Sequence, residues 1–168
     1  MNCHGDLLFT ICGSRTDLRR LSLLIYYARD VFGRMGLSGR YLSEATAFSE
    51  EIIAQVGQIS EQSVLQTELK FKTFHDSLSV PMLLLLLVSE QFSKYCPGLS
   101  LQVKYQAVSG KTDTLFFGEF HYDQALKRWH MFGDMPPGGL FCPEFPTSSW
   151  ETYRSLYESR LKVFELSF

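Results

Sequence analysis

The sequence predicts an α+β domain, a two-layer sandwich in which helices lie on one side of a mostly antiparallel sheet of four to five strands. Two kinds of segment indicate this class. Segments 65–73 and 99–107 alternate between apolar and polar residues, as strands with one wetted face do. Segments 18–35 and 79–95 carry apolar residues in helical patterns. A ferredoxin-like plan with additions is one arrangement that fits the order of these elements.

The first strand is expected over residues 7–12, because this short apolar run is closed by Gly13. Apolar residues occupy both alternating positions, which predicts burial on both faces. A long amphipathic helix follows, with Ser14 or Thr16 as its N-cap and Gly36 as its C-cap. Its apolar residues recur at intervals of three and four: Leu18, Leu21, Ile25, Ala28, Phe32 and Met35.

Two more helices are expected before residue 96. A shorter one follows the Gly39–Leu42 step, ends before Gly57, and is placed at the periphery of the fold. The other should run from Ser79 to Tyr95, because Pro81 is tolerated only in a first turn. This helix is apolar nearly all round, so we expect it to be central.

The second half of the chain predicts a meander. Strands 99–107 and 114–122 are joined by a short loop that contains glycine, as in a hairpin, and segment 127–132 adds the next strand. Segment 133–149 holds four prolines and three glycines, which predicts a long loop. A final helix is expected after the capping residue Ser148.

Length and charge limit the classes of protein that the chain can represent. Its 168 residues fit one domain spanning 1–168, since no linker, repeat or low-complexity segment divides them. A net charge of −2 supplies no field that would attract nucleic acid, so no nucleic-acid partner is expected. The four cysteines form no C-x-x-C pair, no basic leader is present, and the longest apolar run is too short to span a membrane. The sequence therefore favours a soluble, cytoplasmic protein with no membrane partner.

No linear motif of catalysis or cofactor binding occurs in the sequence. The P-loop, the Rossmann glycine fingerprint, the G-x-S-x-G elbow, the H-E-x-x-H helix and the zinc-deaminase signature are all missing. We therefore expect no catalytic residue and no cofactor, and a binding protein rather than an enzyme. A nucleophile and a base can still meet in space without a linear motif. A small enzyme or ligand-binding domain with a pocket near the 133–149 loop remains the alternative.

Glu119, His121 and His130 form the one cluster that could ligate a metal. A tight turn between the two strands would bring all three to one face of the sheet, and two imidazoles with a carboxylate suit zinc or iron. A slip of one residue would scatter them over both faces. The more ordinary interpretation is a polar outer face on which Glu119 pairs with His130, so no metal is expected.

Aromatic side chains are more numerous in the later strands than a two-layer domain can bury. Aromatic residues beside arginine are frequent anchors of protein interfaces. We therefore hypothesise a partner-binding surface made by the outer sheet face and the 133–149 loop. A further helix over that face is the alternative. The residues assigned to the surface are Trp129, Phe141, Phe116, Phe120 and Arg128.

The turn from Gly13 to Leu18, the long helix after it, and the Gly39–Leu42 step before another helix resemble small α+β immunity proteins of bacterial toxin–immunity systems. The resemblance covers about the first third of the chain. It implies a cytoplasmic protein that neutralises a cognate toxin by binding it directly. The expected function is therefore non-catalytic protein binding, with a toxin as the expected class of partner.

Overall fold

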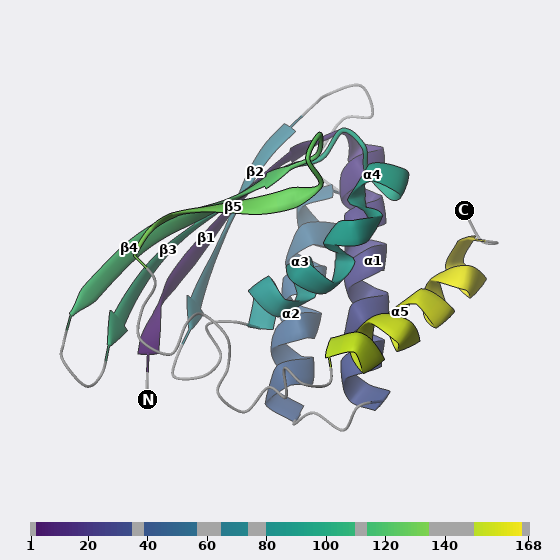
Figure 1. The fold of residues 1–168 in the computed structure, drawn as a ribbon, viewed down its shortest axis with the longest axis horizontal. Helices are drawn as coiled ribbons and strands as arrows, with labels where there is room; N and C mark the ends of the chain where they lie inside the picture. The colour runs from purple at the N-terminus through teal and green to yellow at the C-terminus, as the bar shows by residue number, and fades with distance from the viewer. Residues whose placement is uncertain are drawn as a thin grey trace.

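A computed structural model describes residues 3–34, 39–56, 65–73, 80–109, 114–134 and 150–165. They form one five-stranded sheet with the helices on one side of it (Figure 1). The expected α+β sandwich is therefore confirmed. The elements, in chain order, are β1 (Cys3–Gly13), α1 (Arg15–Arg34), α2 (Gly39–Val56), β2 (Leu65–Thr73), α3 (Val80–Val88), the 3-10 turn η2 (Ser89–Gln91), α4 (Phe92–Tyr95), β3 (Ser100–Ser109), β4 (Leu115–Asp123), β5 (Arg128–Gly133) and α5 (Trp150–Glu165).

The sheet has the order β2-β1-β3-β4-β5, and each neighbouring pair is antiparallel. A ferredoxin-like plan begins with a split β-α-β unit, in which the first two strands run parallel with another strand between them. Here β1 and β2 are instead adjacent and antiparallel, and it is β2 and β3 that run parallel on either side of β1. The chain therefore has one split β-α-β unit, but it does not begin with one. The reason lies in the number of helices between β1 and β2. Because α1 leads away from the end of β1 and α2 leads back, β2 starts beside Gly13, where Leu65 is its partner.

Strand β1 lies inside the sheet, but only one of its faces is buried. Leu7, Phe9 and Ile11 are at most 1% exposed, whereas the alternate residues Leu8, Thr10 and Cys12 are half-buried. The expectation that both faces would be covered is wrong. Within the described part of the chain, the helices pack on one side only, so the other side of the sheet contacts solvent (Figure 1).

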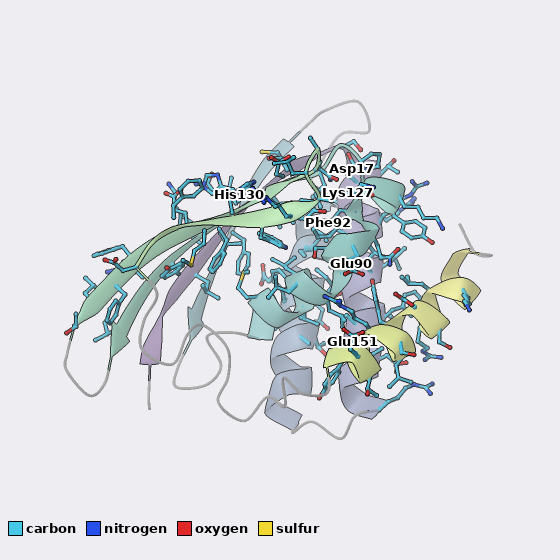
Figure 2. The ribbon with its side chains drawn as sticks, viewed as in Figure 1. Asp17, Glu90, Phe92, Lys127, His130 and Glu151 are labelled. Carbon is cyan, nitrogen blue, oxygen red and sulfur yellow. The ribbon has the colours of Figure 1, made fainter. Side chains whose placement is uncertain are left out.

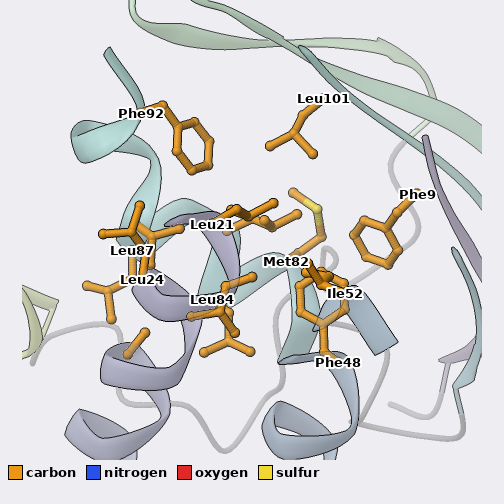
Figure 3. Packing of buried hydrophobic residues seen from close by; sticks show 14 of the residues in the cluster. Phe9, Leu21, Leu24, Phe48, Ile52, Met82, Leu84, Leu87, Phe92 and Leu101 are labelled. Carbon is orange, nitrogen blue, oxygen red and sulfur yellow. The ribbon is translucent and has the colours of Figure 1, made fainter. Parts of the chain in front are cut away.

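The core lies between the sheet and the helices (Figure 3). Phe9 of β1 meets Phe48 of α2 with their ring centroids 4.9 Å apart. Helix α2 is longer than expected and is not peripheral, because the Gly39–Leu42 step is helical and Phe48 and Ile52 are fully buried. The amphipathic face of α1 is buried at Leu18, Leu21, Ile25 and Ala28, as expected, and Leu24 and Val31 are buried with it. The side chain of Phe32 and the whole of Met35, the other two residues of the expected face, lie outside the described residues.

Helix α3 is buried on several sides, as its apolar sequence predicted. It ends at Val88, earlier than expected, and η2 and α4 continue the path to Tyr95. Ser89 marks this change, because its hydroxyl donates a hydrogen bond of 2.9 Å to the carbonyl of Leu86. None of the helices that the structure describes is long and apolar enough to cross a membrane.

Ser14, one of the two expected N-caps, caps α1. Its Oγ accepts a hydrogen bond from the backbone N–H of Asp17 at 3.1 Å, and Asp17 Oδ2 accepts one from the backbone N–H of Ser14 at 3.0 Å. This reciprocal pair is a capping box in which aspartate replaces the usual glutamate. Thr16, the other candidate, is exposed within the first turn.

Replacing Ser14 by Ala is expected to lower the free energy of unfolding by about 1 kcal/mol, because the first turn of α1 loses its side-chain acceptor. Thr16→Ala is the matched control, since it changes an exposed position of the same turn and should cost less than about 0.5 kcal/mol. Urea denaturation of both variants measures the difference. Equal losses would show that the capping box does not stabilise this helix.

Candidate binding surface on the open face of the sheet

We call the side of the sheet that the helices leave uncovered the open face. Alternation along each strand and the register between strands align its residues in rows. One row runs through Thr10, Gln102, His121 and His130 on four adjacent strands. The open face comprises Leu8, Thr10 and Cys12 of β1; Ser100, Gln102, Lys104, Gln106 and Val108 of β3; Leu115, Phe117, Glu119, His121 and Asp123 of β4; and Arg128, His130 and Phe132 of β5.

The turn between β4 and β5 fixes the register that the sequence left open. Asp123 Oδ1 accepts hydrogen bonds from the backbone N–H groups of Ala125 and Leu126, at 2.9 and 3.1 Å. Lys127 then takes a left-handed conformation with φ 53°. This four-residue connection places Asp123 opposite Arg128 and therefore sets His121 opposite His130.

Two carboxylate–imidazole pairs lie on the open face. His121 Nε2 is 2.7 Å from Glu119 Oε2, and His130 Nε2 is 3.5 Å from Asp123 Oδ2. The side-chain hydrogen bond with His121 is the main cause that lowers the pKa of Glu119, and nearby Lys104 lowers it further. Backbone hydrogen bonds from Leu126 and Ala125 lower the pKa of Asp123, and His130 adds to them. Both carboxylates are thereby held in their charged form.

Glu119, His121 and His130 do share one face, but they do not gather around one point. Glu119 pairs with its strand neighbour His121, and the expected pairing with His130 is not observed. The reason is that Asp123, at the turn, pairs with His130, whereas Glu119 pairs with His121. Among the described residues, no group of three or more His, Cys, Asp or Glu side chains is arranged to hold a metal ion.

An apolar patch adjoins the two carboxylate–imidazole pairs. Leu115, Phe117 and Phe132 are 42%, 57% and 56% exposed, which is high for side chains of this size. The rings of Phe132 and His121 meet edge to face, with their centroids 5.2 Å apart. The open face therefore combines exposed aromatic area with neighbouring polar side-chain pairs, as interface cores and rims do.

The residues assigned to partner binding from the sequence are divided by the structure. Phe116, Phe120 and Trp129 lie on the helix side of the sheet, where Phe120 and Trp129 pack against the core. Their assignment to the outer face is wrong. Arg128 is exposed on the open face, as expected. Phe141 lies outside the described residues, as do Ser148 and nearly all of the 133–149 loop.

Sequence reasoning missed Phe117 and Phe132, although a signal for them exists. Glu119, His121 and Asp123 share the odd positions of β4 with Phe117, and so many polar residues mark the solvent side of a strand. Because both faces of β4 carry aromatic residues, hydrophobicity alone does not distinguish the solvent side from the helix side. The polar residues at the odd positions do, and they indicate that Phe117 is exposed on the open face.

A shallow groove of about 500 Å³ crosses the turn end of the open face. The side chain of Gln124 anchors this end, because its Nε2 donates to the carbonyls of Cys96 and Leu99 at 3.1 Å each. The pocket expected near the 133–149 loop lies outside the described residues, and the groove described here extends from the β4–β5 turn to Phe132. The groove is lined by Ser100, His121, Asp123, Gln124, His130 and Phe132, among others.

The described cysteines offer little support for nucleophilic catalysis. Burial raises the pKa of the Cys96 thiol to about 12, and the charge of Asp17 adds to this effect. A thiol of that pKa is not a thiolate at neutral pH and does not act as a nucleophile. Cys12 is half-buried on the open face, and no hydrogen bond in the described part of the chain joins it to a base.

Comparison with known proteins adds no relative: no protein-family model, no curated protein and no solved structure matches the chain. The fold is therefore defined by its topology alone, as an α+β protein with a fully antiparallel five-stranded sheet. Its candidate site is defined by the geometry of the open face.

Proposed function

We propose that the chain is a non-catalytic protein-binding domain that contacts its partner through the open face. The observation that carries this proposal is the exposed apolar patch of Leu115, Phe117 and Phe132 beside two carboxylate–imidazole pairs. Monomeric proteins seldom leave adjoining large apolar side chains in water without a use for them. Aromatic side chains are frequent anchors of protein–protein contacts, because they bury a large area for little loss of conformational freedom.

The composition around the patch supports a protein partner. Toward the β4–β5 turn the patch is bordered by Glu119 with Lys104 and, further on, by Asp123 opposite Arg128, so the acidic and basic groups on this side are balanced. Such a balanced rim supports neither an anionic membrane nor a nucleic-acid backbone as the partner, because both require an excess of basic groups.

A bacterial toxin, neutralised by direct binding, is the class of partner that we propose. The resemblance of the first third of the chain to immunity proteins supports this choice, and the exposed patch supplies a surface for it. The proposed location is the cytoplasm, where thiols such as those of Cys12 and Cys96 stay reduced.

The test compares capture of a partner by three tagged proteins from the native host, read by mass spectrometry. They are the wild type, the Phe117→Ser/Phe132→Ser double variant, and Ile53→Ser as the matched control on the opposite layer, where Ile53 is 54% exposed. Wild type and control should retain the same partner. With the purified partner, the double variant should bind at least about 30-fold more weakly, since hot-spot truncations cost about 2 kcal/mol.

All three positions are exposed, so the substitutions should change stability by no more than about 0.5 kcal/mol. A partner that binds the double variant as tightly as the wild type would exclude the open face as its docking surface. The immunity assignment would be supported by a toxin whose activity the wild type abolishes and the double variant inhibits less completely.

A further inference from the structure

We infer that His121 and His130 form a binding site for a single divalent transition-metal ion, with Zn²⁺ as the probe. This inference is independent of the proposed protein partner, because it concerns the isolated chain. It rests on the register of the two strands, on the carboxylate that holds each imidazole, and on the groove into which both side chains open.

The two imidazoles start from suitable positions. His121 and His130 are direct partners across β4 and β5, and side chains at such positions stand on the same face with Cβ atoms about 5 Å apart. Zinc–nitrogen bonds are about 2.0–2.1 Å long, so one ion can bridge two rings that start this close. Figure 2 shows His130 on the open side of the sheet, away from the helices. Both histidines line the groove, which leaves room for an ion and its water ligands.

Each imidazole already has the outer partner that metal-binding histidines use. Metal ligands of this type commonly donate their second ring N–H to a carboxylate, which fixes the tautomer and raises the basicity of the ligating nitrogen. Here the Nε2 atoms of His121 and His130 face Glu119 and Asp123. When Nε2 carries the donated proton, Nδ1 carries the lone pair. Within the described part of the chain, neither Nδ1 takes part in a hydrogen bond.

The surrounding charges permit a cation. Glu119 and Asp123 bring two negative charges, and Lys104 and Arg128 bring two positive ones on the flanking strands. Lys104 Nζ is 4.0 Å from Glu119 Oε1, and its side chain is 54% exposed, so it can turn away from the site. Two protein ligands leave the other coordination positions to water. The site is therefore an open, exchangeable one rather than a closed structural centre.

The experiment is zinc titration by calorimetry on the full chain with any affinity tag removed. We expect one zinc ion per wild-type chain. His121→Ala and His130→Ala should each weaken binding by more than about tenfold, because loss of an outer-shell partner alone costs about 10–100-fold. Glu119→Gln should fall within that outer-shell range. Gln102→Ala is the matched control, since Gln102 neighbours His121 in the same row but supplies no imidazole.

The His121→Ala/His130→Ala double variant separates this site from general zinc binding, because His4 and His75 remain in it. Circular dichroism confirms that each variant is folded. In nuclear magnetic resonance spectra, zinc should shift the imidazole signals of His121 and His130 and leave those of His4 and His75 unchanged. Zinc binding to the double variant that equals the wild type would overturn the inference. A wild-type chain whose imidazole signals do not respond to zinc would do the same. Neither outcome bears on the protein partner, which is absent from the experiment.

Discussion

Replacing Gly118 by Ala is expected to lower the free energy of unfolding by about 1–3 kcal/mol, the usual range for an overfilled core. Gly118 lies opposite Tyr105, and a Cβ atom built on it would come within 2.0 Å of the Tyr105 hydroxyl and 2.1 Å of the ring. Tyr105 cannot retreat easily, since it is 2% exposed and its hydroxyl donates a hydrogen bond of 2.6 Å to the carbonyl of Asp134. Urea denaturation measures the loss.

A double-mutant cycle isolates this contact. In a Tyr105→Leu background the phenol that meets the new Cβ is gone, so Gly118→Ala should cost distinctly less than in the wild type. The expected coupling between the two positions is about 0.5–3 kcal/mol. An equal loss of unfolding free energy in the two backgrounds would show that the ring of Tyr105 does not lie over Gly118 as it does in the structure.

Replacing Tyr157 by Ala should produce the largest loss, about 3–5 kcal/mol, which is typical of removing a buried aromatic side chain. Tyr157 docks α5 on α1: it is 1% exposed and its hydroxyl donates a hydrogen bond of 3.2 Å to the carbonyl of Leu24. Desolvation by burial raises its pKa well above the ordinary value, so the phenol stays neutral and remains a donor.

Two control variants divide the loss at Tyr157. Tyr157→Phe removes only the hydrogen bond and should cost about 1 kcal/mol. Glu158→Ala changes the next, exposed residue and should stay within about 0.5 kcal/mol. Thermal and urea unfolding measure all three variants. A loss at Tyr157→Ala no greater than at Glu158→Ala would contradict the docking of α5 on the core.

Much of this fold follows from local patterns in the sequence. The alternation of residues 65–73 coincides with β2, and the strands expected at 99–107, 114–122 and 127–132 match β3, β4 and β5 to within one or two residues at each end. Alternation is a reliable guide where one face of a strand is wet and the other is packed. The sequence likewise predicts the N-cap Ser14 and the apolar face of α1.

The errors arose where structure depends on partners far apart in the chain. Apolar residues on both faces of β1 predict that both faces are covered by other layers. On the open face, however, the residues of β1 are half-buried only because the neighbouring strands, such as β3, lie beside them in the sheet. The sequence predicts both helices between β1 and β2, but not that α2 leads the chain back to the end of β1, where β2 pairs with β1 in the antiparallel sense. The central position of α2 has no local signal in the sequence, because it depends on packing against α1.

The candidate site was only half predictable, for a related reason. The sequence predicts that His121 and His130 lie on neighbouring strands, but their register depends on the Asp123 turn and the left-handed Lys127. Alternation alone does not decide the side of the aromatic residues, because Phe116 and Phe117 are adjacent and each fits either face of the strand. Only the packing of Phe120 and Trp129 against the core decides which alternate residues remain outside.

Radical footprinting of the chain, alone and in complex with its captured partner, tests most directly whether the open face is the docking surface. The proposal predicts that Leu115, Phe117 and Phe132, which are exposed in the free chain, become protected in the complex. Tyr26 and Ile53, which are exposed on the helix layer, should be labelled equally in both states. Protection of Tyr26 and Ile53 with unchanged labelling of Phe117 and Phe132 would contradict the proposal and move the docking surface to the helices.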